Sequence, residues 1–265
     1  MNKISVLVLQ EPEVNPVIMT TLAAKITQQK IKVPNELFDL MAFKTGLVEN
    51  VLKMEHPNVI RHSSWTLAIF GASRRFLAQI TRHKIGIDFT SASLQYQDMR
   101  NNFDPVVPYP LIEYTVKTGD TSKVTAYKEM CKQSFNNYNN VIEQLKFDND
   151  TAGYVSCAAS RNLLLVTANT EAWRNIIKER ICNRNTLETQ YVALKIWETL
   201  IHAKDGFFMF SNLGPSCMTD KCTQGKMSCK KPYRKIEDCI EAIQNIEDER
   251  FPFISQYEAM EVLNK

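Results

Sequence analysis

The sequence predicts an α+β fold, a helix-rich single domain with a small mixed or antiparallel sheet. Apolar residues recur in steps of three and four over several long segments, most clearly over 122–145, and this is the period of a helix. Strand-like apolar runs are few, and the best of them is Ile4–Leu9. Because no unit of 20–50 residues repeats and no stretch has the composition of a linker, we treat 1–265 as one domain.

The predicted elements begin with the strand Ile4–Leu9. Asn15 and Pro16 then predict a helix start, with Asn at the N-cap and Pro in the first turn. Asn185 with Glu188 three residues later predicts a capping box for the last helix. Helical patterns also cover the stretch from Pro34 to Leu52 and the segments 72–83, 122–145, 152–165, 170–179 and 186–203.

Composition and charge exclude several classes of protein. With 44% hydrophobic and 23% charged residues, the chain is too apolar for a disordered protein. The net charge of +3, from 32 basic and 29 acidic residues, is too small to predict a nucleic-acid partner. No apolar run is long enough to span a membrane, and we expect no signal peptide. Seven cysteines without an export signal are typical of reduced thiols, so we expect a cytoplasmic protein.

A basic segment stands before the irregular, polar stretch Lys84–Pro108, which is typical of a loop that lines a site. On a helix over 72–83, Arg75, Gln79 and Arg82 would share one face, and the helix would end in Arg82-His83-Lys84. Two interpretations stay open at this point: a solvated basic face, or a site for an anion and a planar heterocycle, which guanidinium and amide groups suit.

A series of motifs in a fixed order covers nearly the whole chain. They are His62-Ser63-Ser64-Trp65-Thr66, Ser73-Arg74, Gln79, Arg82-His83-Lys84, Ser93-Leu94-Gln95-Tyr96, Asn101-Asn102-Phe103, Val106-Val107-Pro108, Ser160-Arg161-Asn162-Leu163-Leu164, Asn169, Asn175, Arg180, Cys182-Asn183-Arg184, and a tail from Gly214-Pro215-Ser216-Cys217 through Cys222 to Cys229. In this order they resemble the flavin-dependent thymidylate synthases, whose signature is Arg-His-Arg, a spacer and Ser-x-Arg-Tyr.

The resemblance implies an activity, its cofactors and its partners. Members of this family are FAD-dependent homotetramers whose active sites are shared between subunits. They transfer a methylene group from methylenetetrahydrofolate to C5 of dUMP and reduce it with a hydride from flavin, which NADPH recharges. The expected partners are therefore dUMP, methylenetetrahydrofolate, NADPH and further copies of the chain.

Residue roles carry over by position in the same way. Arg180 matches the arginine that is credited with activating the uracil ring, so it is the candidate catalytic residue. The positions that match flavin contacts are His62, Ser64, Arg82, His83, Lys84, Asn169 and Asn175. The positions that match dUMP contacts are Gln79, Arg82, Ser93, Gln95, Arg161 and Arg180.

The chemistry of the residues agrees with these roles. Activating C5 of uracil pushes negative charge onto N3 and O4, which a guanidinium held away from water would stabilise. The chain has no Gly-x-Gly-x-x-Gly or Gly-Lys-Ser/Thr loop, so side chains would have to bind the flavin pyrophosphate. Cys217 is followed by Met218 and no Cys-His pair occurs, which disfavours a cysteine nucleophile.

The chain departs from the family pattern at several positions. Lys84 replaces the third basic residue, Gln95 replaces the Arg of Ser-x-Arg-Tyr, and the spacer 85–92 is one residue longer. The stretch between Arg161 and Asn169 is shorter by roughly one strand. Three hypotheses therefore stay open: dUMP as substrate, methylation or hydroxymethylation of another pyrimidine nucleotide such as UMP, and a non-catalytic descendant that binds nucleotides or nucleic acid.

The tail segment 214–235 carries two further features. Four thiols could bind Zn²⁺, and the alternative is that they are free thiols; they are Cys182, Cys217, Cys222 and Cys229. A basic run could contact the folate glutamate tail or a neighbouring subunit, although we expect a solvated loop; it comprises Lys221, Lys226, Lys230, Lys231, Arg234 and Lys235. We expect Phe251–Lys265 to be a packing or subunit-contact segment.

Overall fold

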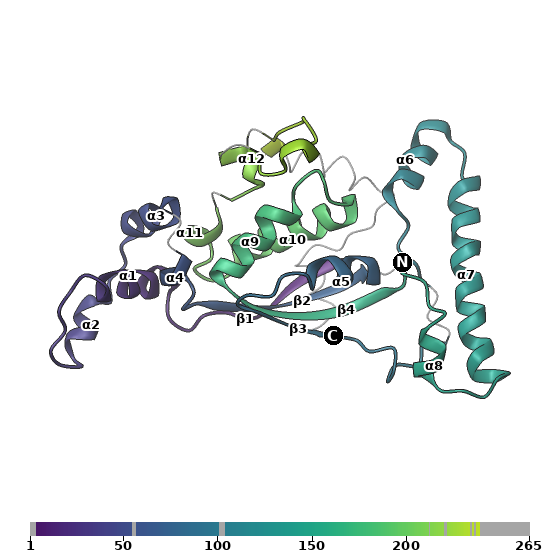
Figure 1. Cartoon of the computed structure of the whole chain (residues 1–265), viewed down its shortest axis with the longest axis horizontal. Coiled ribbons are helices and arrows are strands. Elements are labelled where there is room, and N and C mark those ends of the chain that lie inside the picture. Colours follow the sequence, from purple (N-terminus) through teal and green to yellow (C-terminus); the bar gives the residue numbers. More distant parts are fainter. Residues whose placement is uncertain are drawn as a thin grey trace.

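A computed structural model of the chain describes residues 4–54, 57–100, 104–211, 213–219, 222–233, 235 and 237–238. The predicted α+β class is confirmed, because helices cover one face and lie at the two ends of one small antiparallel sheet (Figure 1). The strands are β1 (Ser5–Gln10), β2 (Ser64–Ser73), β3 (Ile87–Ser91) and β4 (Arg161–Asn169). The helices are α1 (Pro16–Ile26), α2 (Glu36–Leu40), α3 (Thr45–Lys53), α4 (Pro57–Ile60), α5 (Arg74–Ile80), α6 (Tyr109–Thr118), α7 (Ser122–Glu143), α8 (Asn149–Gly153), α9 (Thr170–Arg180), α10 (Leu187–His202), α11 (Phe207–Phe210), α12 (Ser216–Thr219) and the short 3₁₀ turn η1 (Gly225–Met227).

The sheet has the strand order β1-β2-β4-β3, and every neighbouring pair is antiparallel. The long central pair places Ser64 opposite Asn169 and Ser73 opposite Arg161. Arg161 and Asn169 therefore lie at opposite ends of β4, roughly 26 Å apart at about 3.3 Å per residue.

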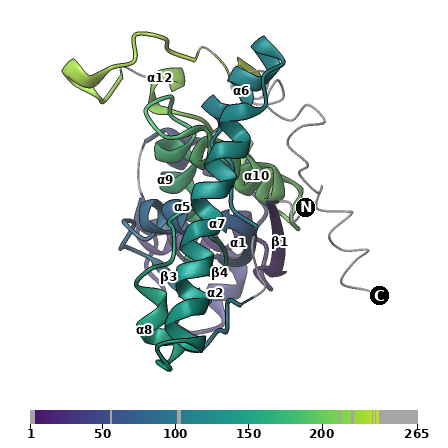
Figure 2. The same cartoon turned by 90° about the vertical axis from the view of Figure 1, so that its right-hand side faces the viewer.

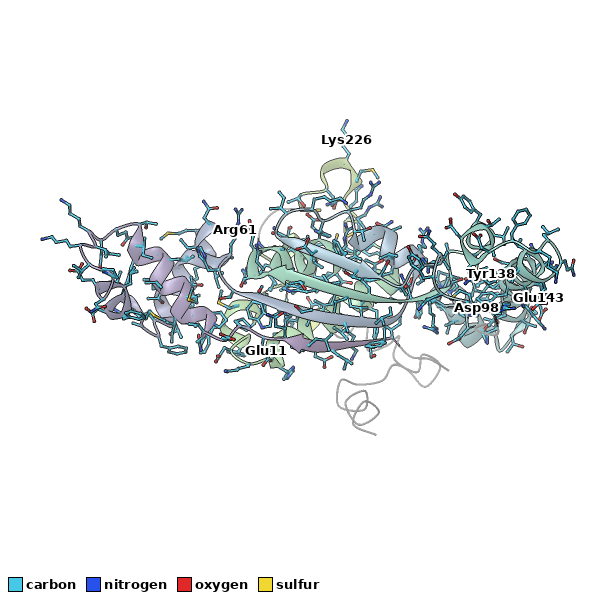
Figure 3. All side chains as sticks on the ribbon, turned by 90° about the horizontal axis from the view of Figure 1, so that it is seen from below. Glu11, Arg61, Asp98, Tyr138, Glu143 and Lys226 are labelled. Carbon is cyan, nitrogen blue, oxygen red and sulfur yellow. The ribbon has the colours of Figure 1, made fainter. Side chains whose placement is uncertain are left out.

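One face of the sheet packs under α5, α9 and α10 and forms the main hydrophobic core (Figure 1). Trp65 and Trp173 are fully buried there, and the core includes residues from Ile4 to Tyr233. This continuity supports the interpretation of one domain, which stays a prediction. The opposite face, seen from below in Figure 3, carries a smaller apolar cluster of Leu7, Ala68 and Phe70.

The helical hairpin of α6 and α7, with α8, stands at one end of the sheet and lies apart from the main core (Figures 1 and 2). It has its own small cluster, in which Met99, Tyr138 and Ala152 are buried. The Tyr138 hydroxyl accepts a hydrogen bond from the Met99 amide at 3.2 Å, and this contact joins the stretch after β3 to the cluster.

Several sequence predictions are confirmed. The strand near Ile4–Leu9 is β1, and the helix after Asn15 is α1, whose Val17 amide donates to the Asn15 side chain at 2.8 Å. The segments 122–145, 170–179 and 186–203 are the helices α7, α9 and α10. The described part of the chain has no helix with the length and apolar character that a bilayer crossing requires.

Other predictions are wrong, mostly where an apolar run is a strand. The predicted helix over 72–83 forms only from Arg74 to Ile80, because β2 continues to Ser73 and the Ser73 hydroxyl caps the helix. The predicted helix over 152–165 is instead the end of α8 followed by β4, and the stretch expected to be an irregular loop contains β3. The predicted pattern between 34 and 52 is split into α2 and α3.

A few predicted features lie outside the described residues. They are the motif Asn101-Asn102-Phe103, the basic residues Lys221 and Arg234, and the segment Phe251–Lys265.

Candidate active site

Arg180 is the last residue of α9, and its guanidinium lies against the turn that follows α5. Its Nε donates a hydrogen bond to Nε2 of His83 at 3.0 Å. Burial, together with the Arg180 charge, lowers the pKa of His83 to about 4. His83 is therefore neutral near pH 7, with Nε2 as the acceptor and the ring proton on Nδ1. The structure thus brings together two of the predicted motifs, Arg82-His83-Lys84 and Arg180, whose bonded residues are 97 positions apart.

A cavity of about 540 Å³ opens at this end of α9. Its walls come from the end of α9, from the loop that follows it, and from the stretches 215–217 and 222–224. Three of its lining residues are cations, Lys178, Arg180 and Arg184, and one is an acid, Glu179, so the cavity has an excess of positive charge. Asn175, a predicted flavin contact, lines the same cavity. Such a donor set suits an anionic ligand with hydrogen-bond acceptors.

A second group of predicted flavin contacts lies where α9 begins. The Asn169 side chain caps α9 by accepting a hydrogen bond from the Ala172 amide at 2.9 Å, and Asn169 is the register partner of Ser64. Gly86 has a positive φ of 69°, and a Cβ there would lie 2.3 Å from Asn169 Nδ2, so only glycine fits. The turn 81–86 thus runs from Arg180 to Asn169. It carries the exposed side chains of Arg82 and Lys84.

Arg161 lies at the other end of the sheet and does not meet Arg180. Its Nε donates to the Asp104 carboxylate at 3.0 Å, and its Nη1 donates to the Gly71 carbonyl at 2.7 Å. Ser93 follows β3 on this side, since the Ala92 amide donates to the Leu163 carbonyl, and Gln95 is exposed beside it. Within one chain, the predicted nucleotide contacts Arg161, Ser93 and Gln95 therefore lie apart from Arg180.

Glu188 and Asp104 are two residues that the sequence analysis did not place in the site. Glu188 does not form the predicted capping box, because Thr186 caps α10 by accepting from the Thr189 amide. Its carboxylate instead accepts hydrogen bonds from the amide and hydroxyl of Ser73, both at 2.7 Å. Burial raises its pKa, and the Ser73 hydrogen bonds and the charge of Arg161 oppose this shift.

The four candidate zinc ligands, Cys182, Cys217, Cys222 and Cys229, line one cavity of about 240 Å³. However, no three Cys, His, Asp or Glu side chains within the described ranges are arranged to hold a metal ion, and all four thiols are free. Structural zinc is therefore not supported. In the basic run, the described residues Lys226, Lys230, Lys231 and Lys235 are exposed, as expected for a solvated loop.

Comparison with known proteins places the chain in a family. The family model described as thymidylate synthase complementing protein matches residues 11–203. The chain belongs to this family of flavin-dependent thymidylate synthases. The flavin-dependent thymidylate synthase of Clostridium tetani is 26% identical over 231 residues, covering 82% of this chain and 90% of the relative. That of Geobacter sulfurreducens is 23% identical over 223 residues, with the same coverage of 82% and 90%.

Solved structures share the fold. Thymidylate Synthase X from Helicobacter pylori, in a crystal structure with FAD and dUMP, aligns with a TM-score of 0.56 at 18% identity. The alignment covers 78% of this chain and 97% of that chain. The UMP/dUMP methylase PolB from Streptomyces cacaoi, bound with 5-Br dUMP, aligns with a TM-score of 0.58 at 14% identity and covers 80% and 96%.

Proposed function

We propose that this family member is a flavin-dependent thymidylate synthase, which methylates C5 of dUMP with a methylene group from methylenetetrahydrofolate. The observation that carries the proposal is the contact between Arg180 and neutral His83 at the edge of a cationic cavity. Family membership and the dUMP-bound, FAD-bound relative support the same reaction. NADPH would recharge the flavin, as the resemblance implies.

Arg180 is the proposed catalytic residue. Among the described residues its guanidinium is hydrogen-bonded by the neutral groups of His83 and Asn185, and the neighbouring Glu179 acts on its charge only through space. Burial lowers its pKa, but a guanidinium stays protonated near pH 7. A positive charge held this way would stabilise negative charge as it develops on N3 and O4 of the pyrimidine.

The donor set along α9 fits FAD. His62, Ser64 and Asn169 would bind at the start of the helix, and Asn175 would bind along it. The turn residues Arg82, His83 and Lys84 supply cations and a neutral imidazole, which suit a pyrophosphate and a flavin ring system. When bound, the reduced flavin supplies the hydride of the reaction. The residues of this chain would hold it beside Arg180 and keep His83 as a neutral hydrogen-bond acceptor.

We further propose that a complete nucleotide site forms between copies of the chain, in a homotetramer. Within one chain Arg161 is bonded to Asp104 and the Gly71 carbonyl, whereas Arg180 is bonded to His83. The shared active sites that the resemblance implies would let Arg161, Ser93 and Gln95 join Arg180 and Gln79 from another copy. The sheet face away from the main core supports such an assembly, because Leu9 and Leu163 on it are 58% and 42% exposed.

The alternative substrate is UMP. It is raised by one observation, the neutral Gln95 in place of the family's Arg, which changes the predicted nucleotide contacts and so suggests altered substrate recognition. The name of PolB, a UMP/dUMP methylase, indicates that this fold can serve both nucleotides in another protein.

A label-release assay tests the proposal. Purified protein is expected to be yellow, and it should release label from C5 of labelled dUMP in the presence of methylenetetrahydrofolate and NADPH. Release from UMP and not from dUMP would establish the alternative. Colourless protein that cannot be reconstituted with FAD would reject both and favour a non-catalytic binding protein.

A further inference from the structure

Asn185 lies in the loop between α9 and α10, and its side chain reaches back to the end of α9. Its Nδ2 donates hydrogen bonds to the carbonyls of Glu179 at 2.7 Å and of Cys182 at 3.1 Å. Its Oδ1 accepts from Nη1 of Arg180 at 3.4 Å. Two acceptors on one side and a donor on the other leave a single orientation of the amide that satisfies all three partners.

We infer that Asn185 is a positioning residue for the Arg180 guanidinium, so that it sets the direction in which the catalytic cation points. This inference rests on the proposed function of Arg180. The carboxamide is itself anchored to the last turn of α9, so it offers its oxygen to Arg180 from a fixed place.

His83 and Asn185 each accept a hydrogen bond from a different nitrogen of the Arg180 guanidinium. Nε is engaged by His83 and Nη1 by Asn185. A guanidinium has five N–H groups, so three are left, and none of these has a hydrogen-bond partner within the described part of the chain. The cavity that Arg180 lines is where those groups can meet a ligand.

Both contacts come from neutral groups, which matters for the chemistry. A carboxylate in the place of Asn185 would also hold Arg180, but it would cancel much of the positive charge that the reaction needs. Asn185 orients the cation without neutralising it. The predicted role of Asn185 as a helix cap is thus replaced by this role, since Thr186 caps α10.

The test compares three variants in the full chain. Asn185→Ala removes all three hydrogen bonds, and Asn185→Ser keeps a hydroxyl that can donate to the Cys182 carbonyl but is too short to reach Arg180. Asn183→Ala is the matched control, because Asn183 lies in the same loop and contacts Lys231 and Tyr233 instead of Arg180. Thermal melting of each variant establishes that it is folded.

Two readouts are expected to move together in both Asn185 variants. The kcat should fall about tenfold, the change that corresponds to losing a hydrogen bond to a charged group, while the KM for dUMP stays close to the parent value. The pKa of His83, followed by NMR without substrate, should rise by about one unit, because the Arg180 side chain would then lie farther from the imidazole. Glu179 and Arg180 are the charged residues whose side chains contact His83, and Arg82 and Lys84 flank it in the chain. Of these side chains, only that of Arg180 is hydrogen-bonded to the Asn185 side chain, which contacts Glu179 through its backbone carbonyl.

The outcomes separate this inference from the proposed function. If the parent protein has no C5-methylating activity, the proposed function fails, and the histidine titration still tests whether Asn185 positions Arg180. An unchanged His83 pKa in both folded Asn185 variants would overturn the inference. An equal loss of kcat in Asn183→Ala would also overturn it, because the loss would then follow from the loop and not from the contact with Arg180.

Discussion

Arg180 and Arg161 are both predicted nucleotide contacts, yet one has neutral side-chain partners and the other has a charged one. Arg180 is held by the neutral side chains of His83 and Asn185. Arg161 is paired with the Asp104 carboxylate and a backbone carbonyl. A guanidinium held by neutral groups keeps its full charge for a ligand, whereas one paired with a carboxylate is already largely compensated. This contrast supports the proposed catalytic role of Arg180, and it leaves Arg161 paired with Asp104 until a ligand competes for it.

The largest effect is expected for Arg180→Ala. Turnover should fall by about 10²-fold or more, because a preorganised charge at the site of developing negative charge is lost, while FAD stays bound. Label release from C5 of dUMP and flavin absorbance measure the two properties separately. Arg184→Ala, an exposed cation of the same cavity, is the control and should lose far less. Near-normal turnover in Arg180→Ala would remove it from the catalytic role.

A smaller, opposite pair of effects is expected at Arg161. Asp104→Asn removes the compensating charge, so the KM for dUMP should fall a few-fold if Arg161 binds the phosphate. Arg161→Ala should raise the same KM by about tenfold. If neither substitution changes the KM for dUMP in folded protein, Arg161 has only a structural role and does not bind the nucleotide.

The smallest effect concerns stability and pH. The folded-state pKa of His83 is about 4, below its ordinary value near 6.5, so between these values the unfolded chain binds the proton more readily. Stability should therefore fall as the pH drops from about 6.5 to about 4, by roughly 1–3 kcal/mol for this group. Melting temperatures across this range should fall less steeply in His83→Gln, whose amide oxygen can still accept from Arg180. Parallel curves for the two proteins would show that His83 titrates normally.

Much of the site could be predicted from the order of motifs along the chain. Arg180 and His83 were both expected in it, and the structure brings them within 3.0 Å. The local periodicity could not show that Asp104 pairs with Arg161 or that Glu188 binds Ser73, 115 residues away. Neither could it distinguish the strand β4 from a buried helix, because short apolar runs suit both.

The sequence by itself determined several of the helices, the first strand and the family. Helical spacing specified α7, α9 and α10, and the ordered motifs identified the family and the candidate site residues. Only the tertiary structure decided which of these residues lie close together. It put Arg161 and Asn169 at opposite ends of one strand, and it turned Asn185 from a predicted helix cap toward Arg180. The reason is physical: periodicity depends on neighbours a few residues apart, whereas a site depends on hydrogen bonds between distant segments that form only when the sheet and its helices pack.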